Sequence, residues 1–172
     1  MILPTLPQAF IERMTGQLGD MAPAYFEALQ QPPVRGLRLN PFKHPDNALD
    51  SLVPGLGQPI PWWPQARYLS LDSIAGVLPL HDAGAYYLQE PSAMVPAAVL
   101  CAMPGETVLD LCAAPGGKST QLATAMCGQG TLVCNEPVAA RAQVLSRNLE
   151  RMGVTNAIVV SADPAQLADN WP

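Results

Sequence analysis

A short loop of small residues at positions 112–118 is the part of the sequence best suited to hold a cofactor. It follows a strand-like apolar run at 107–111 and precedes a helical pattern that begins at Ser119. Glycine and alanine let backbone N–H groups approach a ligand, and the N-terminus of the next helix carries partial positive charge. The pattern therefore predicts a nucleotide-like cofactor at the end of this strand.

Two phosphate-binding motifs are excluded by their spacing. Gly117-Lys118-Ser119 matches the end of a Walker A loop, but that motif needs a glycine five positions before Gly117, where this sequence has Cys112. The dinucleotide pattern G-x-G-x-x-G also fails, because the loop contains only the adjacent pair Gly116 and Gly117. These exclusions favour a loop that binds an adenosine cofactor without a pyrophosphate.

Two acidic residues follow the next two strand-like runs. Glu136 lies 26 residues after Asp110, where a carboxylate can accept hydrogen bonds from both hydroxyls of a ribose. Glu136 also fits a simpler role as an acid near a helix N-terminus. Asp163 can likewise cap a helix that has Pro164 in its first turn. Both interpretations of Glu136 remain open at this point.

The loop and two further segments resemble motifs of a known protein family. Residues 110–118 resemble the first cofactor motif of the Sun-type RNA 5-methylcytosine methyltransferases, and residues 86–94 and 33–40 resemble further segments of their RsmF-type ribosomal RNA branch. The resemblance implies S-adenosyl-L-methionine as cofactor and ribosomal RNA as substrate. It also implies that Asp163 faces the adenine amino group. The methionine end of the cofactor would lie against Cys112, Ala113, Ala114, Pro115, Gly116, Gly117 and Lys118.

Cys112 is not predicted to be the nucleophile. Methylation at carbon 5 of cytosine requires a thiolate that first adds to carbon 6. In the family that the sequence resembles, the catalytic cysteines belong to later motifs, one of them in an Asp-Ala-Pro-Cys context. Neither Asp-Ala-Pro-Cys nor Pro-Cys-Ser occurs here. We therefore expect the catalytic residues beyond Pro172, and an inactive N-terminal portion that carries the cofactor-binding half.

The composition limits how this chain could bind RNA. Charged residues make up 13% of the sequence and the net charge is -5, which argues against a module with a broad basic surface. Arg35, Arg38 and Lys43 cluster near one predicted strand, and Tyr86 and Tyr87 could stack on a base. The alternative is that these are ordinary strand and core residues. Most phosphate contacts must then come from a local patch or from outside this chain.

The sequence also bears on metal binding, secretion and membrane insertion. The four cysteines form no C-x-x-C pair and have no histidine at ligand spacing, so no metal site is predicted. No secretory signal opens the sequence and no apolar run is long enough to span a membrane, which favours a soluble cytoplasmic protein. A non-catalytic cofactor- or partner-binding domain and a nucleotide hydrolase remain as alternative functions.

The elements around the loop predict an α/β fold. Strand-like runs at 107–111, 131–134 and 157–160 alternate with helical patterns at 119–126 and 138–152, which indicates a Rossmann-like half-sheet of three parallel strands with ligands at its carboxyl end. A third helix is predicted over 89–103, bent at Pro96. Upstream, two helices between 6 and 29 and a strand at 34–40 indicate a small α+β domain. We predict domains at 1–82 and 83–172.

Overall fold

The computed structural model describes residues 6–43 and 51–170, and the chain divides into two compact units, Met1–Pro33 and Val34–Pro172. The first unit contains α1 (Gln8–Leu18), a 3-10 turn (Gly19–Met21) and α2 (Ala22–Ala28). The two helices predicted between 6 and 29 are therefore confirmed. The predicted domain boundary after residue 82 stays a prediction.

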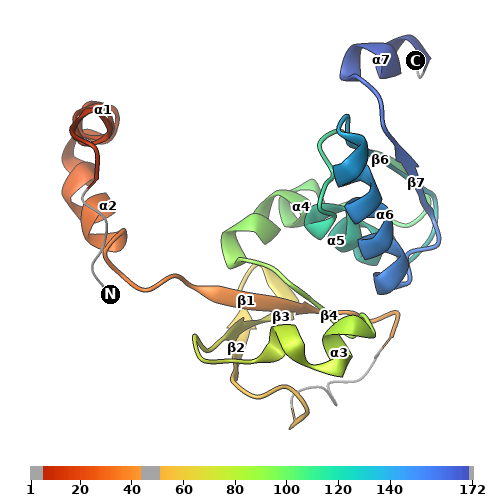
Figure 1. The fold of residues 1–172 in the computed structure, drawn as a ribbon, viewed down its shortest axis with the longest axis horizontal. Coiled ribbons are helices and arrows are strands. Elements are labelled where there is room, and N and C mark those ends of the chain that lie inside the picture. The colour runs from red at the N-terminus through yellow and green to blue at the C-terminus, as the bar shows by residue number, and fades with distance from the viewer. Residues whose placement is uncertain (1–5, 44–50, 171–172) are drawn as a thin grey trace. The chain divides into compact units, whose positions relative to one another are not determined.

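The second unit begins with an antiparallel sheet in the order β2-β3-β1-β4 (Figure 1). Its strands are β1 (Arg35–Leu39), β2 (Leu56–Ile60), β3 (Trp63–Leu69) and β4 (Tyr86–Leu88). A 3-10 turn (Ala75–Val77) and the short helix α3 (Pro79–Asp82) connect β3 to β4. Central strand β1 confirms the predicted strand, and one of its faces contributes Leu37 and Leu39 to a buried cluster with Tyr86.

A second, parallel sheet follows in the order β5-β6-β7. Its strands are β5 (Thr107–Asp110), β6 (Thr131–Asn135) and β7 (Ala157–Val160). Between them run α5 (Gly117–Ala125) and α6 (Ala139–Met152), and α7 (Pro164–Asn170) follows β7. The predicted Rossmann-like half-sheet of three parallel strands is confirmed.

The core of this half lies on one face of the parallel sheet. Val108 from β5 and Leu132 from β6 form a buried cluster with Leu122 from α5 and Leu145 from α6. On the opposite face Leu109 is 51% exposed and Ile158 is 49% exposed. The period-2 alternation of the strands therefore places the helices α5 and α6 on a single face.

The predicted single helix over 89–103 is wrong in its continuity. The structure has a 3-10 helix (Pro91–Met94) followed by α4 (Val95–Leu100). Pro96 has no N–H group to donate, and it stands in the first turn of α4, where a helix does not need that donor. The preceding 3-10 helix has its own cap, because the Glu90 carboxylate accepts hydrogen bonds from the amides of Ser92 and Ala93. Proline therefore starts a new helix here.

Among the helices that the structure describes, none has both the length and the apolar character needed to cross a membrane.

Candidate functional site

The loop between β5 and α5 depends on a glycine at position 116. Gly116 has φ +112° and ψ +6°, a conformation that residues with a side chain rarely adopt. A Cβ atom at this position would also lie 3.2 Å from Cδ1 of Leu145 on α6. Conformation and close packing both require a residue without a side chain, so the chain can turn directly from the strand into the helix.

The start of α5 is tied back to the end of β5. The hydroxyl of Ser119 donates a hydrogen bond of 2.7 Å to Oδ2 of Asp110. Close to these two residues, burial raises the pKa of the Cys134 thiol to about 12. The Asp110 carboxylate therefore orders the loop from within the sheet, and Cys134 is a neutral thiol at physiological pH.

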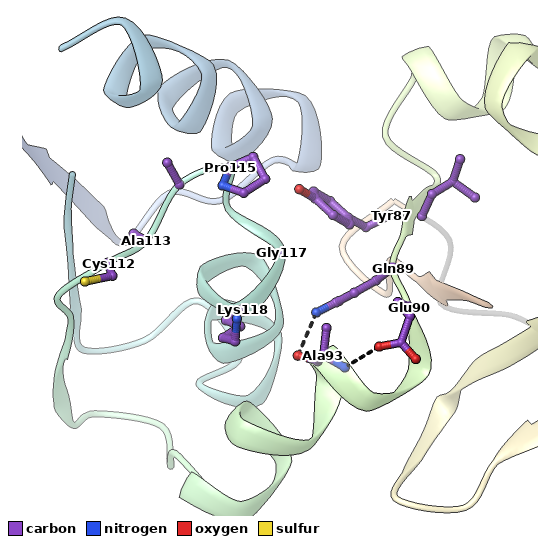
Figure 2. Close-up of a pocket in the computed structure, with 11 residues that line it drawn as sticks. Tyr87, Gln89, Glu90, Ala93, Cys112, Ala113, Pro115, Gly117 and Lys118 are labelled. Atoms are coloured by element: carbon purple, nitrogen blue, oxygen red, sulfur yellow. Dashed lines mark hydrogen bonds between the residues drawn. The ribbon is translucent and has the colours of Figure 1, made fainter. Parts of the chain in front are cut away.

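A pocket of about 260 Å³ lies between this loop and the segment that leaves β4 (Figure 2). One wall holds six of the seven predicted cofactor-loop residues, while Gly116 is buried and does not line the pocket. The opposite wall comes from residues 87–90 and Ala93. The complete lining is Tyr87, Leu88, Gln89, Glu90, Ala93, Cys112, Ala113, Ala114, Pro115, Gly117 and Lys118.

Apart from Tyr87, which was a candidate for base stacking, the residues of the second wall were not assigned a function from the sequence. Gln89 donates from Nε2 to the carbonyl of Ala93 at 3.1 Å, which fixes its amide across from Gly117 (Figure 2). Hydrogen bonds from the Ser92 hydroxyl and from backbone amides lower the pKa of Glu90, so its carboxylate is charged at neutral pH. The resemblance of residues 86–94 to the family was the available signal, but it gave no reason to place these side chains opposite the loop.

Arg38 connects the antiparallel sheet to the first turn of α5. Its side chain is fully buried, and Nη2 donates to the carbonyl of Gly117 at 3.0 Å and to Oγ1 of Thr120 at 2.6 Å. Nε points to Oε1 of Gln89 at 3.4 Å, and the guanidinium lies 5.7 Å from the centre of the Tyr87 ring. Burial lowers the pKa of Arg38 to about 9, so the group is positively charged at neutral pH. The hypothesis that Arg38 contacts RNA is therefore wrong.

Arg35 and the two tyrosines of the hypothetical RNA cluster are also engaged within the fold, whereas Lys43 is exposed. Nη1 of Arg35 donates to backbone carbonyls after β3, the shortest of these bonds being 2.7 Å to Leu71. Tyr86 is fully buried and Tyr87 is 8% exposed. Tyr86 donates its hydroxyl proton to the carbonyl of Ala75. The alternative interpretation, that the tyrosines are core residues, is the one that the structure supports.

Glu136 lies at the end of β6 and is 2% exposed. Its Oε1 accepts a hydrogen bond of 3.0 Å from the amide of Val138, so it does act as an acid at the start of α6. Its Oε2 forms an ion pair of 3.1 Å with Nη1 of Arg141. Arg141 also donates from Nη2 to the carbonyl of Ala114 at 3.3 Å. The sequence suggested a solvated helix face for Arg141, and its side chain is 58% exposed while it makes these two contacts.

Asp163 follows β7 and is exposed. Its Oδ1 accepts a hydrogen bond of 2.8 Å from the amide of Ala165, and its carbonyl accepts one of 3.2 Å from the amide of Leu167. The capping role at the start of α7 is thus present. Its carboxylate stands at the same carboxyl edge of the parallel sheet as Glu136, because β6 and β7 are parallel neighbours.

Asn135 joins the ends of the three parallel strands, and sequence reasoning missed it. Its buried amide donates to the carbonyls of Leu111 at 3.2 Å and Ala162 at 3.1 Å, and its Oδ1 accepts from the amide of Ala162 at 3.1 Å. Its own carbonyl accepts from the amide of Ala113 at 2.9 Å. A polar residue at the end of an apolar strand was the available signal. Asn135 fixes the segments around the predicted loop and Asp163 relative to one another.

The residues of 6–43 and 51–170 include no group of three histidine, cysteine, aspartate or glutamate side chains arranged to hold a metal ion. The candidate site combines the backbone groups of the loop, the buried carboxylate of Glu136 and a pocket lined by both polar and apolar side chains. Together with the parallel sheet, this is the architecture of a Rossmann-like methyltransferase fold.

Comparison with known proteins agrees with that class. Residues 6–91 match the N-terminal domain of the 16S rRNA methyltransferase RsmF, and residues 97–172 match the 16S rRNA methyltransferase RsmB/F family. The chain belongs to the RsmB/F family of 16S rRNA methyltransferases.

Individual relatives cover most of this chain. Ribosomal RNA small subunit methyltransferase F of Erwinia tasmaniensis is 38% identical in an alignment that covers 91% of this chain and 35% of the relative. The protein of the same name from Cronobacter sakazakii is 37% identical in an alignment that covers 88% of this chain and 34% of the relative. A methyltransferase homolog from Pyrococcus horikoshii has a similar structure, with a TM-score of 0.74 and 28% identity over 96% of this chain and 60% of that one. The chain spans about a third of the length of the two sequence relatives.

Proposed function

We propose that this chain is the cofactor-binding, N-terminal part of an S-adenosyl-L-methionine-dependent enzyme that methylates carbon 5 of a cytosine in ribosomal RNA. The observation that carries the proposal is the loop at 112–118, which follows the first strand of a parallel sheet and lines a pocket, while the buried carboxylate of Glu136 follows the neighbouring strand of the same sheet. Membership of the RsmB/F family supports it, and so do the names of the relatives.

The residues present fit this cofactor. The loop leaves a pocket of about 260 Å³ with small side chains on one wall, where the methionine end would lie against residues 112–118. Each oxygen of the Glu136 carboxylate accepts one contact and has further acceptor capacity for the vicinal hydroxyls of a ribose. Asp163 would receive the adenine amino group. When bound, the cofactor supplies an electrophilic methyl group for transfer to the base.

We further propose that none of the cysteines in this sequence is the nucleophile. Cys134 is buried with a pKa of about 12, so it provides almost no thiolate at neutral pH. Cys112 belongs to the loop that would hold the cofactor. The sequence has neither Asp-Ala-Pro-Cys nor Pro-Cys-Ser, so no catalytic residue can be assigned within it. The 172-residue chain should therefore transfer no methyl group to ribosomal RNA by itself, and methylated product would contradict that part of the proposal.

Calorimetry with S-adenosylhomocysteine tests the cofactor site. Glu136→Ala removes two acceptors for charged hydrogen bonds, each worth about 1.5–3 kcal/mol, so the affinity should fall roughly a hundred-fold or more. Asp163→Ala should weaken binding less, because its carboxylate is exposed. Glu150→Ala is the matched control, since this exposed acid on α6 lies outside the candidate site.

The alternative functions predict different results in the same experiment. ATP binding that depends on magnesium, with no binding of S-adenosylhomocysteine, would favour the nucleotide hydrolase and refute the cofactor assignment. Equal affinities of wild type, Glu136→Ala and Glu150→Ala for S-adenosylhomocysteine would place the ligand elsewhere on the chain.

A further inference from the structure

One face of α6 contacts the backbone of the candidate loop at consecutive positions. Arg141 donates from Nη2 to the carbonyl of Ala114 at 3.3 Å, and Asn148 donates from Nδ2 to the carbonyl of Pro115 at 2.8 Å. The two side chains are seven residues apart, which is two helical turns, so they project from the same side of α6. The helix therefore holds two successive loop carbonyls from outside.

Between these two residues, α6 also sets how closely the loop can approach. Leu145 lies four residues after Arg141, and its Cδ1 would be 3.2 Å from a Cβ atom on Gly116. The Asn148 Cβ would be 3.5 Å from the same atom. Positions 141, 145 and 148 thus contact loop residues 114, 115 and 116 as one surface of the helix.

The orientation of the Asn148 amide is itself fixed. Arg151 donates to Oδ1 of Asn148 from Nε at 3.4 Å and from Nη2 at 3.3 Å. Because a guanidinium only donates, the amide oxygen must face Arg151 and the amide N–H groups must face Pro115. Asn148 is therefore set as a donor toward the loop.

Arg141 has a second contact that Asn148 lacks. Its Nη1 pairs with Oε2 of Glu136 at 3.1 Å while Nη2 reaches Ala114, so one guanidinium spans two parts of the candidate site. A planar guanidinium presents several N–H groups in a fixed fork and can serve two acceptors at once.

We propose that Arg141 and Asn148 are positioning residues for an adenosine ligand that carries an amino-acid tail. Asn148 holds the loop that would receive the tail. Arg141 holds the same loop and also orients the Glu136 carboxylate that would receive the ribose hydroxyls. This inference rests on the proposed function, and neither residue needs to touch the reacting atoms.

A comparison of two ligands distinguishes the role of Asn148 from the double role of Arg141. S-adenosylhomocysteine has both the ribose and the amino-acid tail, whereas adenosine has only the nucleoside. In calorimetry, Asn148→Ala should lower the affinity for S-adenosylhomocysteine about five-fold or more, since one hydrogen bond to the loop is lost, and should leave the affinity for adenosine within two-fold of wild type. Arg141→Met should lower the affinity for both ligands about ten-fold. Arg147→Met is the control, because it makes the same charge change at an exposed position of α6 and should alter neither affinity.

Hydrogen exchange on the ligand-free chain tests the positioning directly. Arg141→Met and Asn148→Ala should each speed exchange of the amide hydrogens of residues 113, 114, 116 and 117 relative to Arg147→Met, while exchange in the core of β6 stays unchanged. Unchanged loop exchange in both variants would overturn the inference whether or not the wild type binds a ligand. If wild type binds S-adenosylhomocysteine and all three variants bind it equally, the inference fails and the proposed function stands. If wild type binds neither ligand, the proposed function fails, and the exchange result alone decides the positioning role.

Discussion

The turn before β4 makes a backbone contact with the end of α6 that a single methyl group should break. Gly84 has φ +73°, and a Cβ atom there would overlap the carbonyl oxygen of Arg151 and lie 2.8 Å from its carbonyl carbon. Ordinary contacts between carbon atoms are about 3.5–4.0 Å. Asn40 bridges the same place, because its amide donates to the carbonyls of Gly84 at 2.7 Å and Met152 at 2.8 Å.

The expected cost of Gly84→Ala has two parts. Placing alanine at a positive φ costs about 1 kcal/mol. Relieving the overlap requires the two backbone segments to separate by roughly an ångström, which breaks the pair of buried Asn40 hydrogen bonds at about 1 kcal/mol each. The total is about 3 kcal/mol. For a chain of this size, that corresponds to a fall in Tm of roughly 6–12 °C.

Gly105→Ala is the matched control for this prediction. Gly105 also has a positive φ, +90°, but a Cβ atom there would meet nothing within 4 Å. Gly105→Ala should therefore lower the free energy of unfolding only by the conformational cost, about 1 kcal/mol, which corresponds to a fall in Tm of roughly 2–4 °C. Thermal unfolding followed by circular dichroism compares the two variants. If Gly84→Ala melts no lower than Gly105→Ala, the close packing of the β4 turn against α6 is refuted.

Three further predictions concern buried polar groups. Asn135→Asp replaces the donor that joins the strand ends with a carboxylate facing two carbonyls, and urea unfolding should show a loss of about 2–4 kcal/mol; an unchanged midpoint would contradict this. Cys134 should resist thiol reagents at pH 8 while the exposed cysteines react, and four equally reactive thiols would refute its burial. Because folding raises the pKa of Cys134 from 9.0 to about 12, its contribution to stability should be constant below pH 9 and fall as the pH rises toward 12. Arg38→Lys should cost about 1–3 kcal/mol in urea unfolding, because one ammonium cannot reproduce the guanidinium fork; wild-type stability would contradict that geometry.

The parallel half of the fold could be predicted because its signals are local. Each strand of β5, β6 and β7 is a short apolar run, and each following helix has its own period, so the alternation is visible without any long-range contact. β4 was missed for the opposite reason. Tyr86–Leu88 has three residues, and its strand character comes from pairing with β1, almost fifty positions away in the sequence.

The candidate site was likewise predictable only where its residues have a local signal in the sequence. Loop residues 112–118 are contiguous, so one motif located them, and the acids after β6 and β7 followed from the rule that ligands lie at the carboxyl ends of parallel strands. The wall formed by Gln89 and Glu90 could not be found this way. Its place opposite the loop depends on how the antiparallel sheet packs against α5. The contacts of Arg141 could not be predicted, because helical spacing gives the side of a helix and says nothing about which backbone carbonyls lie beside it.

Arg38 shows why the antiparallel sheet is part of the site. In β1, Leu37 and Leu39 project to one face and Arg38 to the other, and the sequence alone left open whether Arg38 contacts RNA or is an ordinary strand residue. The structure covers both faces, and the guanidinium binds the Gly117 carbonyl in the first turn of α5. The loop is thereby held from two directions, by β1 through Arg38 and by α6 through Arg141. A ligand that moves either contact must strain the other, so binding at the loop and the packing of the antiparallel sheet should be thermodynamically linked.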